Sequence, residues 1–157
     1  MIDWYYQGLL FAILLAASWF DIKSRIVPNQ LILVGLIAGI LMNAWVSTPG
    51  RFSFGLYGLL IGFGVMVVPY ALNWLGAGDV KLFAVVGLFL GPEKIIDAAI
   101  LTAFCGGLLA LYYLIKMKIT KAQNLPLMPS SNKPALPYVI AIFGGTLLTL
   151  IFSDSLV

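Results

Sequence analysis

Long apolar runs alternate with short polar connections along the whole chain. A helix needs about 20 mostly apolar residues to cross the hydrocarbon core of a bilayer. Six segments are candidates for such helices, at residues 4–20, 30–46, 56–75, 80–90, 96–115 and 137–152. The pattern predicts an all-α, polytopic membrane protein with about six transmembrane helices.

The connections between these segments hold most of the helix breakers and charges. They read DIKSRIVPN, VSTPGRFSF, GAGD, GPEK and KMKITKAQNLPLMPSSNKPA. None of them is large enough to bury a hydrophobic core of its own. We therefore expect residues 1–157 to form a single membrane-embedded domain, with no soluble domain.

The fourth segment is too short to cross a bilayer alone. As a helix, residues 80–90 span about 16 Å, whereas the hydrocarbon core is about 30 Å thick. Either the helix continues through GPEK, or it begins below the membrane surface at Gly78 and Asp79. We favour the second reading, in which the non-helical stretch from Gly76 to Gly78 lines a water-filled site.

Composition narrows the classes of chemistry that are open to the chain. It is 62% hydrophobic and 10% charged, whereas soluble domains are about 45–50% apolar and 25% charged. It has one cysteine, Cys105, and no histidine. These counts exclude Ser–His and Cys–His catalysis and an ordinary zinc site. We expect no metal, no cofactor and no nucleic-acid partner.

Basic side chains gather in the first, third and fifth connections. These hold seven of the nine lysines and arginines, and only Arg51 and Lys94 lie in the other two. Because cytoplasmic loops are enriched in Lys and Arg, the odd connections are expected in the cytoplasm and both termini outside. The basic loop at 116–136 is expected to lie against anionic headgroups, with substrate docking as the alternative role.

Two of the six acidic residues stand at cytoplasmic ends of apolar segments. Asp21 follows the first segment and Asp79 precedes the fourth. Two complete crossings separate them, so the chain returns to the same face of the membrane. Each is either one member of a dyad or an interface carboxylate that is solvated by headgroups or paired with Lys23, Arg25 or Lys81. In a dyad that shares a proton, one carboxylate activates water while the other polarises a carbonyl.

Helix dipoles suggest how such a pair would divide its roles. A negative charge is favoured at the beginning of a helix, where Asp79 stands, and disfavoured at the end, where Asp21 stands. The hypothesis is that Asp79 ionises first and that Asp21 keeps the shared proton.

Other residues are expected to support the fold. Pro28 and Asn29 are expected to begin the second helix, with Asn29 as its N-cap and orientation of Asp21 as the alternative role. Asn43 and Asn73 are expected to make interhelical hydrogen bonds, with the site as the alternative for Asn73. Pairs of glycines four residues apart predict close helix packing, at Gly58 and Gly62 and at Gly87 and Gly91.

Three stretches of the chain resemble the type IV prepilin peptidases, which are membrane aspartic proteases that process pilin and pseudopilin precursors. GAGDVKLFAVVGLFLGP resembles their GxGD motif region. FDIKSRIVPN resembles their other motif, an aspartate followed by a basic stretch and Ile/Val-Pro-Asn, and LPYVIAIFGG resembles the opening of their last helix. The resemblance covers most of the chain.

The resemblance implies that Asp21 and Asp79 are the catalytic pair of an aspartic endopeptidase. It implies removal of a basic leader at the cytoplasmic face of a prokaryotic inner membrane, usually after a glycine and just before an apolar helix. Gly76 and Gly78 match the motif glycines and would shape the loop, and Lys81 matches a lysine that often follows the motif. Prepilin or pseudopilin precursors and the lipid bilayer are the implied partners.

One departure from the family concerns a second activity. Many bifunctional members carry an insertion with four cysteines and also N-methylate the new terminus, whereas this chain has one cysteine. It resembles the short, peptidase-only branch of tight-adherence pilus systems, so we expect no methyltransferase domain.

Two alternatives to this function stay open. One is another GxGD protease, of the presenilin or signal-peptide-peptidase type, in which the first aspartate follows tyrosine; here Phe20 precedes Asp21. The other is a non-enzymatic transporter or scaffold with Asp21 and Asp79 in a proton path.

Overall fold

The structure is a computed structural model that describes residues 2–24, 26–45, 50–122 and 138–155. All regular elements in these ranges are α-helices, as predicted. They are α1 (Ile2–Ser24), α2 (Asn29–Trp45), α3 (Arg51–Ala71), α4 (Ala77–Ala122) and α5 (Tyr138–Ser155).

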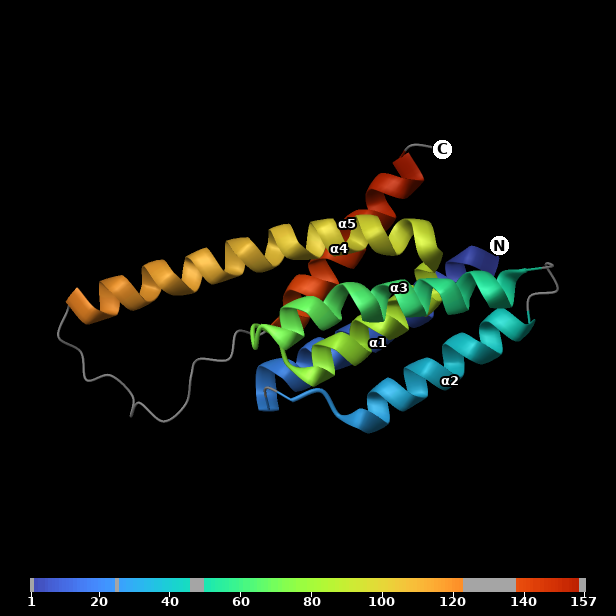
Figure 1. The fold of residues 1–157 in the computed structure, drawn as a ribbon, viewed down its shortest axis with the longest axis horizontal. Coiled ribbons are helices and arrows are strands. Elements are labelled where there is room, and N and C mark those ends of the chain that lie inside the picture. The colour runs from blue at the N-terminus through green and yellow to red at the C-terminus, as the bar shows by residue number, and fades with distance from the viewer. Residues whose placement is uncertain (1, 25, 46–49, 123–137, 156–157) are drawn as a thin grey trace.

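Helix α4 consists of two arms that meet at Gly91. This residue has φ 81° and ψ 178°, a conformation that glycine adopts far more readily than other residues, and Pro92 follows it. We call residues 77–90 the short arm and residues 92–122 the long arm. Figure 1 shows the two arms running in opposite directions. Counted with the two arms of α4 apart, the described residues form six helical segments, of which the fourth is short.

Several segment ends differ from the prediction. Helix α3 covers Arg51–Ala71 and not 56–75, because the chain already turns at Asn73, which has a positive φ of 58°. The short arm begins at Ala77, so Gly78 lies in its first turn and not in a non-helical loop. The long arm continues to Ala122, through the start of the predicted polar loop at 116–136. The rest of that loop lies outside the described residues.

The outer surface of the bundle suits a lipid environment. Three helical stretches are long and apolar enough to cross a membrane, Tyr5–Ser24, Arg51–Ala71 and Ala77–Lys116, and Asn29–Trp45 and Tyr138–Phe152 are shorter apolar helices. Large apolar side chains, among them Trp19, Trp45 and Phe104, are exposed. A chain that turns such side chains outward is a membrane protein.

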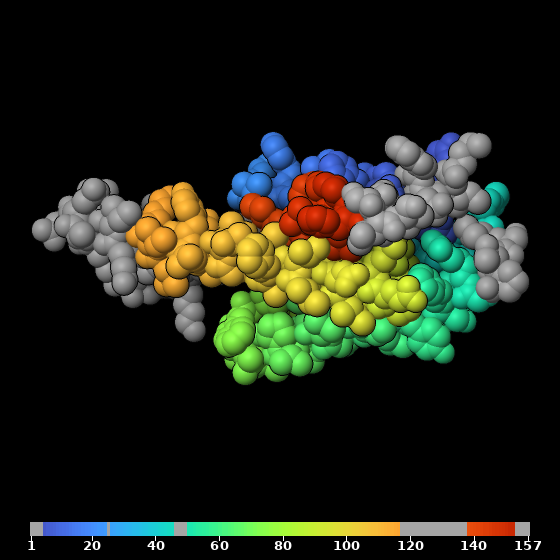
Figure 2. All heavy atoms as spheres, turned by 90° about the horizontal axis from the view of Figure 1, so that it is seen from above, coloured from blue at the N-terminus to red at the C-terminus, as the bar shows by residue number. Residues whose placement is uncertain are grey.

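The helices place the two aspartates at the same end of the bundle. Figure 1 shows the start of α1, the end of α5 and the bend between the arms of α4 at one end. The end of α1, the turn between α3 and α4 and the start of α5 lie at the other. Figures 1 and 2 show the long arm projecting past the other helices at this second end.

The short arm is the centre of the fold. Residues 82–91 are all buried, as expected of a helix that is apolar on every side. Helix α3 packs directly on its backbone, because a Cβ added to Gly58 would collide with the carbonyl oxygen of Gly87, and one on Gly87 with that of Gly58. The predicted close packing at these glycines is confirmed.

Helix α2 is tied to the short arm by a buried amide. The Nδ2 of Asn43 donates to the carbonyl oxygen of Gly39 in its own helix at 2.8 Å and to that of Leu88 at 3.1 Å. The predicted interhelical hydrogen bond of Asn43 is confirmed.

The glycine contact between α3 and the short arm predicts a stability difference between two substitutions on one helix. Gly58→Ala should destabilise the protein by about 1–3 kcal/mol or more, because the new methyl group meets rigid backbone. Gly64→Ala is the matched control, since a Cβ there meets no atom within 4 Å. Unfolding of both variants in detergent micelles measures the difference, and equal stabilities would contradict the packing.

Candidate active site: an aspartate pair between helix ends

Asp21 is a buried carboxylate in the last turn of α1. Only 6% of its surface is exposed. The backbone N–H of Val139 donates to its Oδ2 at 3.3 Å. Val139 stands in the first turn of α5, where helix N–H groups have no partner within the helix. Asp21 therefore joins the end of α1 to the beginning of α5.

Asp79 is a half-buried carboxylate in the first turn of α4. The backbone N–H of Gly76 donates to its Oδ2 at 3.0 Å, and its own N–H donates to the Gly76 carbonyl at 3.1 Å. The side-chain bond is the one that an acidic residue makes in a capping box. It fixes the carboxylate against the turn between α3 and α4.

The bundle brings these two carboxylates together. The end of α1, which carries Asp21, and the beginning of α4, which carries Asp79, lie at the same end of the bundle, where the charge of Asp21 acts on Asp79. Tyr138, which precedes the Asp21 hydrogen-bond donor in the chain, also interacts electrostatically with Asp79. The ends of three helices thus meet at one pair of acids.

The expected contrast between the two helix dipoles is not present. Asp79 lies at the beginning of α4, but Asp21 is bonded to the beginning of α5 as well as standing at the end of α1. Backbone N–H groups and positive helix ends therefore face both carboxylates. The dipoles therefore do not support the hypothesis that Asp79 ionises first and that Asp21 keeps a shared proton.

Two contacts hold the segment after Asp21 against the beginning of α4. A Cβ on Gly78 would lie 3.5 Å from the Cβ of Val27, a buried residue. The Nζ of Lys81 donates to the Oδ1 of Asn29 at 3.3 Å. Gly78 and Lys81 thus connect the two aspartate-bearing segments.

The prediction that Asn29 caps α2 is wrong. The N–H groups of Leu31 and Ile32 donate to the carbonyl oxygen of Pro28, at 3.0 and 3.3 Å. Pro28 therefore provides the acceptor at the start of α2, which leaves the Asn29 side chain to bind Lys81.

Three further residues named from the sequence lie at the edge of this site or beyond the described part. Asn73 is exposed in the turn after α3, with a left-handed backbone, so its predicted interhelical role is wrong. Lys23 is exposed in the last turn of α1. Arg25 lies outside the described residues.

Sequence reasoning missed the contribution of Tyr138 and Val139. The resemblance singled out their segment only as the start of the last helix, because a backbone donor has no side-chain signature. Within the described ranges, no three Cys, Asp or Glu side chains are grouped so that they could hold a metal ion.

The part of the chain that contains both aspartates matches the model of a known protein family. The model described as the type IV leader peptidase family matches residues 8–111, which include Asp21, Gly76, Gly78 and Asp79. No solved structure shows significant similarity to the chain.

Curated proteins with similar sequences carry related names. A Bacillus subtilis protein named prepilin leader peptidase/N-methyltransferase is 27% identical over 148 residues, which are 93% of this chain and 55% of the relative. An Escherichia coli protein named type 4 prepilin-like proteins leader peptide-processing enzyme is 32% identical over 150 residues, 86% of this chain and 52% of the relative. The chain spans about half the length of these relatives.

The contact between Gly78 and Val27 predicts a size limit at the site. Gly78→Ala should keep wild-type stability, because its methyl group would stand at an ordinary contact distance of 3.5 Å. Gly78→Leu should lose about 1–3 kcal/mol, since the larger side chain must displace Val27. Thermal unfolding in detergent compares the two, and a stable Gly78→Leu protein would contradict this packing.

Proposed function

The chain belongs to the type IV leader peptidase family, and on that basis we propose that it is an aspartic endopeptidase that removes the basic leader from type IV pilin-like precursors. The observation that carries the proposal is that the end of α1 with Asp21 and the beginning of α4 with Asp79 lie at the same end of the bundle. Their chain positions are far apart, yet each is fixed by a backbone N–H.

The proposed chemistry needs only these two side chains and water. Like charges at close range do not both ionise cheaply, so the pair shares one proton. The ionised carboxylate takes a proton from water, which attacks the scissile carbonyl carbon, while the protonated carboxyl donates to the carbonyl oxygen. The tetrahedral intermediate collapses when the amide nitrogen receives a proton and leaves as an amine.

The surroundings of the pair favour hydrolysis over proton transport. A proton path across the bundle would need polar groups or water beyond Asp79. Instead, the short arm continues from Leu82 to Gly91 as a buried apolar helix. The buried polar side chains described elsewhere in the bundle are not ionisable; they are Asn43, Thr102, Thr146 and Thr149. The two aspartates therefore lie at one end of the bundle, and the part of the short arm that continues from Leu82 into the bundle offers no side chain that could carry a proton further.

We place the pair at the cytoplasmic face of a prokaryotic cytoplasmic membrane, with both termini outside. Lys23, Lys81 and Lys116 stand in helix ends on the same side as the pair. Arg51 and Lys94 stand near the opposite end. The excess of positive charge near the pair supports this orientation.

The proposal concerns peptide-bond hydrolysis alone. The name of the Bacillus subtilis relative also mentions N-methyltransferase, but the chain aligns with only 55% of that relative. The expected absence of methyltransferase activity stays a prediction.

Removing either acid should stop cleavage. With Asp21→Asn or Asp79→Asn, cleavage of a co-expressed prepilin should fall by about 10²–10⁴-fold or more, because the general base or acid is lost. A gel shift of the precursor in membranes measures this. Asp97→Asn and Glu93→Gln are matched controls, since both carboxylates are exposed at the far end of the bundle. Full cleavage by either site variant would refute the proposed pair.

The orientation can be tested independently of activity. A membrane-impermeant thiol reagent should label a cysteine in place of Gly50 in intact cells or spheroplasts, because that end is proposed to lie outside. A cysteine in place of Asn73, beside the pair, should be labelled only after the membrane is opened. Cys105→Ser removes the native thiol, and the reverse labelling pattern would overturn the orientation.

A further inference from the structure

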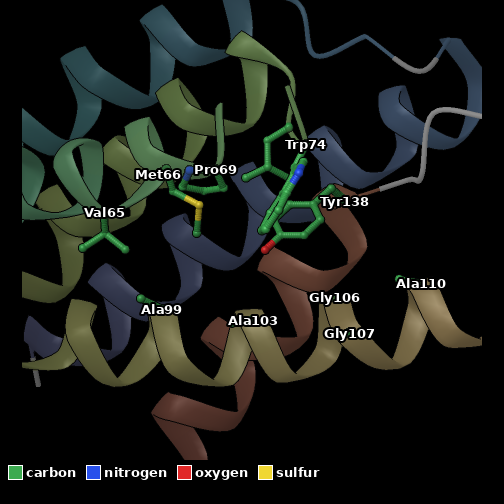
Figure 3. A pocket seen from close by; sticks show the side chains of 11 residues that line it. Val65, Met66, Pro69, Trp74, Ala99, Ala103, Gly106, Gly107, Ala110 and Tyr138 are labelled. Carbon is green, nitrogen blue, oxygen red and sulfur yellow. The ribbon is translucent and has the colours of Figure 1, made fainter. Parts of the chain in front are cut away.

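A cavity of about 490 Å³ lies beside the aspartate pair, between α3 and the long arm of α4. Figure 3 shows Val65, Met66 and Pro69 of α3 on one side of it and the long arm on the other. Figure 2 shows α3 and the long arm separating towards the end that carries the pair.

The wall on the long arm is made of small residues. They are Ala99, Ala103, Gly106, Gly107 and Ala110. The adjoining stripe of the same arm is different, because it exposes Ile100, Phe104, Leu108 and Leu111. Large side chains thus face the lipid, while small ones face the cavity and leave the helix backbone open to close approach.

Two residues that line the cavity are chain neighbours of the residues that hold the aspartates. Leu75 and Tyr138 both line it. Each is followed in the chain by the residue whose N–H holds an aspartate, Gly76 for Asp79 and Val139 for Asp21. Figure 3 shows Trp74 and Tyr138 at one end of the cavity, with the Tyr138 hydroxyl directed into it.

The residues that line the cavity indicate what kind of ligand it can bind. All of its residues are uncharged, and most are aliphatic, alanine or glycine. A basic leader would find no acidic partner there. The volume is similar to the ~420 Å³ of one turn of an α-helix, taken as a cylinder 10 Å wide and 5.4 Å high.

Building on the proposed function, we propose that this cavity binds one face of the apolar helix of the substrate, next to the bond that is cut. The alanines and glycines of the long arm let the backbone of the substrate helix approach that of the arm closely, as transmembrane helices do at small residues. An acyl chain has no need of such a wall. The link through Leu75 and Tyr138 puts the end of the bound helix at Asp21 and Asp79.

Two synthetic peptides separate helix binding from cleavage. Both carry a basic leader and a glycine; the long one continues with about 20 Leu and Ala residues, and the short one ends with a few polar residues. In nanodiscs, Ala103→Phe should lower kcat/KM for the long peptide by about tenfold or more. The value for the short peptide should stay within about twofold. Leu108→Phe, on the lipid-facing stripe of the same arm, should change neither.

An equal loss for both peptides, or no loss for the long one, would overturn the cavity as the helix site. Photocrosslinking gives a second answer that does not depend on cleavage or on the Ala103 variant. The long peptide should crosslink to p-benzoylphenylalanine in place of Val65, which lines the cavity, and not in place of Val68, an exposed valine of the same helix. Crosslinks at residue 65 to phospholipid alone would instead make the cavity a lipid site.

The two proposals fail in different ways. If wild-type protein cleaves neither peptide, the proposed peptidase function fails, while the crosslinks at residues 65 and 68 still decide whether the cavity binds an apolar helix.

Discussion

The enclosure of the short arm of α4 is the constraint on which the rest of the structure depends. This arm is apolar on every side, and α3 can cover it closely only because Gly58 and Gly87 let the two backbones touch. Asn43 adds a hydrogen bond from α2 to the carbonyl oxygen of Leu88. Because α2 and α3 hold the short arm in place, the first turn of this arm, which contains Asp79, has a fixed position in the bundle.

The same contacts explain why acids can stand at this position. Helix ends leave backbone N–H groups without intrahelical partners, and in a bilayer such groups need partners within the protein. Asp79 takes the N–H of Gly76, and Asp21 takes that of Val139. Each carboxylate thus satisfies the backbone at the start of a helix, so the requirement of the fold and that of the proposed reaction are met by the same two side chains.

The cavity and the pair depend on the same two turns. Residues 75 and 76 form the end of the turn between α3 and α4, and residues 138 and 139 form the start of α5. In each case one residue faces the cavity and the next holds an aspartate. The kink at Gly91 makes this possible, because it returns the long arm along α3 to the end where the pair lies.

The sequence by itself determined the helical class, the short apolar fourth segment and the position of both acids at the same end of the bundle. Apolar length and the parity of crossings are properties of the chain alone, and so are the glycine spacing and the GxGD and Asp-to-Pro-Asn motifs. Only the tertiary structure decided the partners of the acids and the position of the cavity. Val139, Leu75 and the alanines of the long arm act through backbone groups or through the absence of a large side chain. Such roles cannot be recognised from the type of residue, because they arise only when helices that are distant in the sequence pack together.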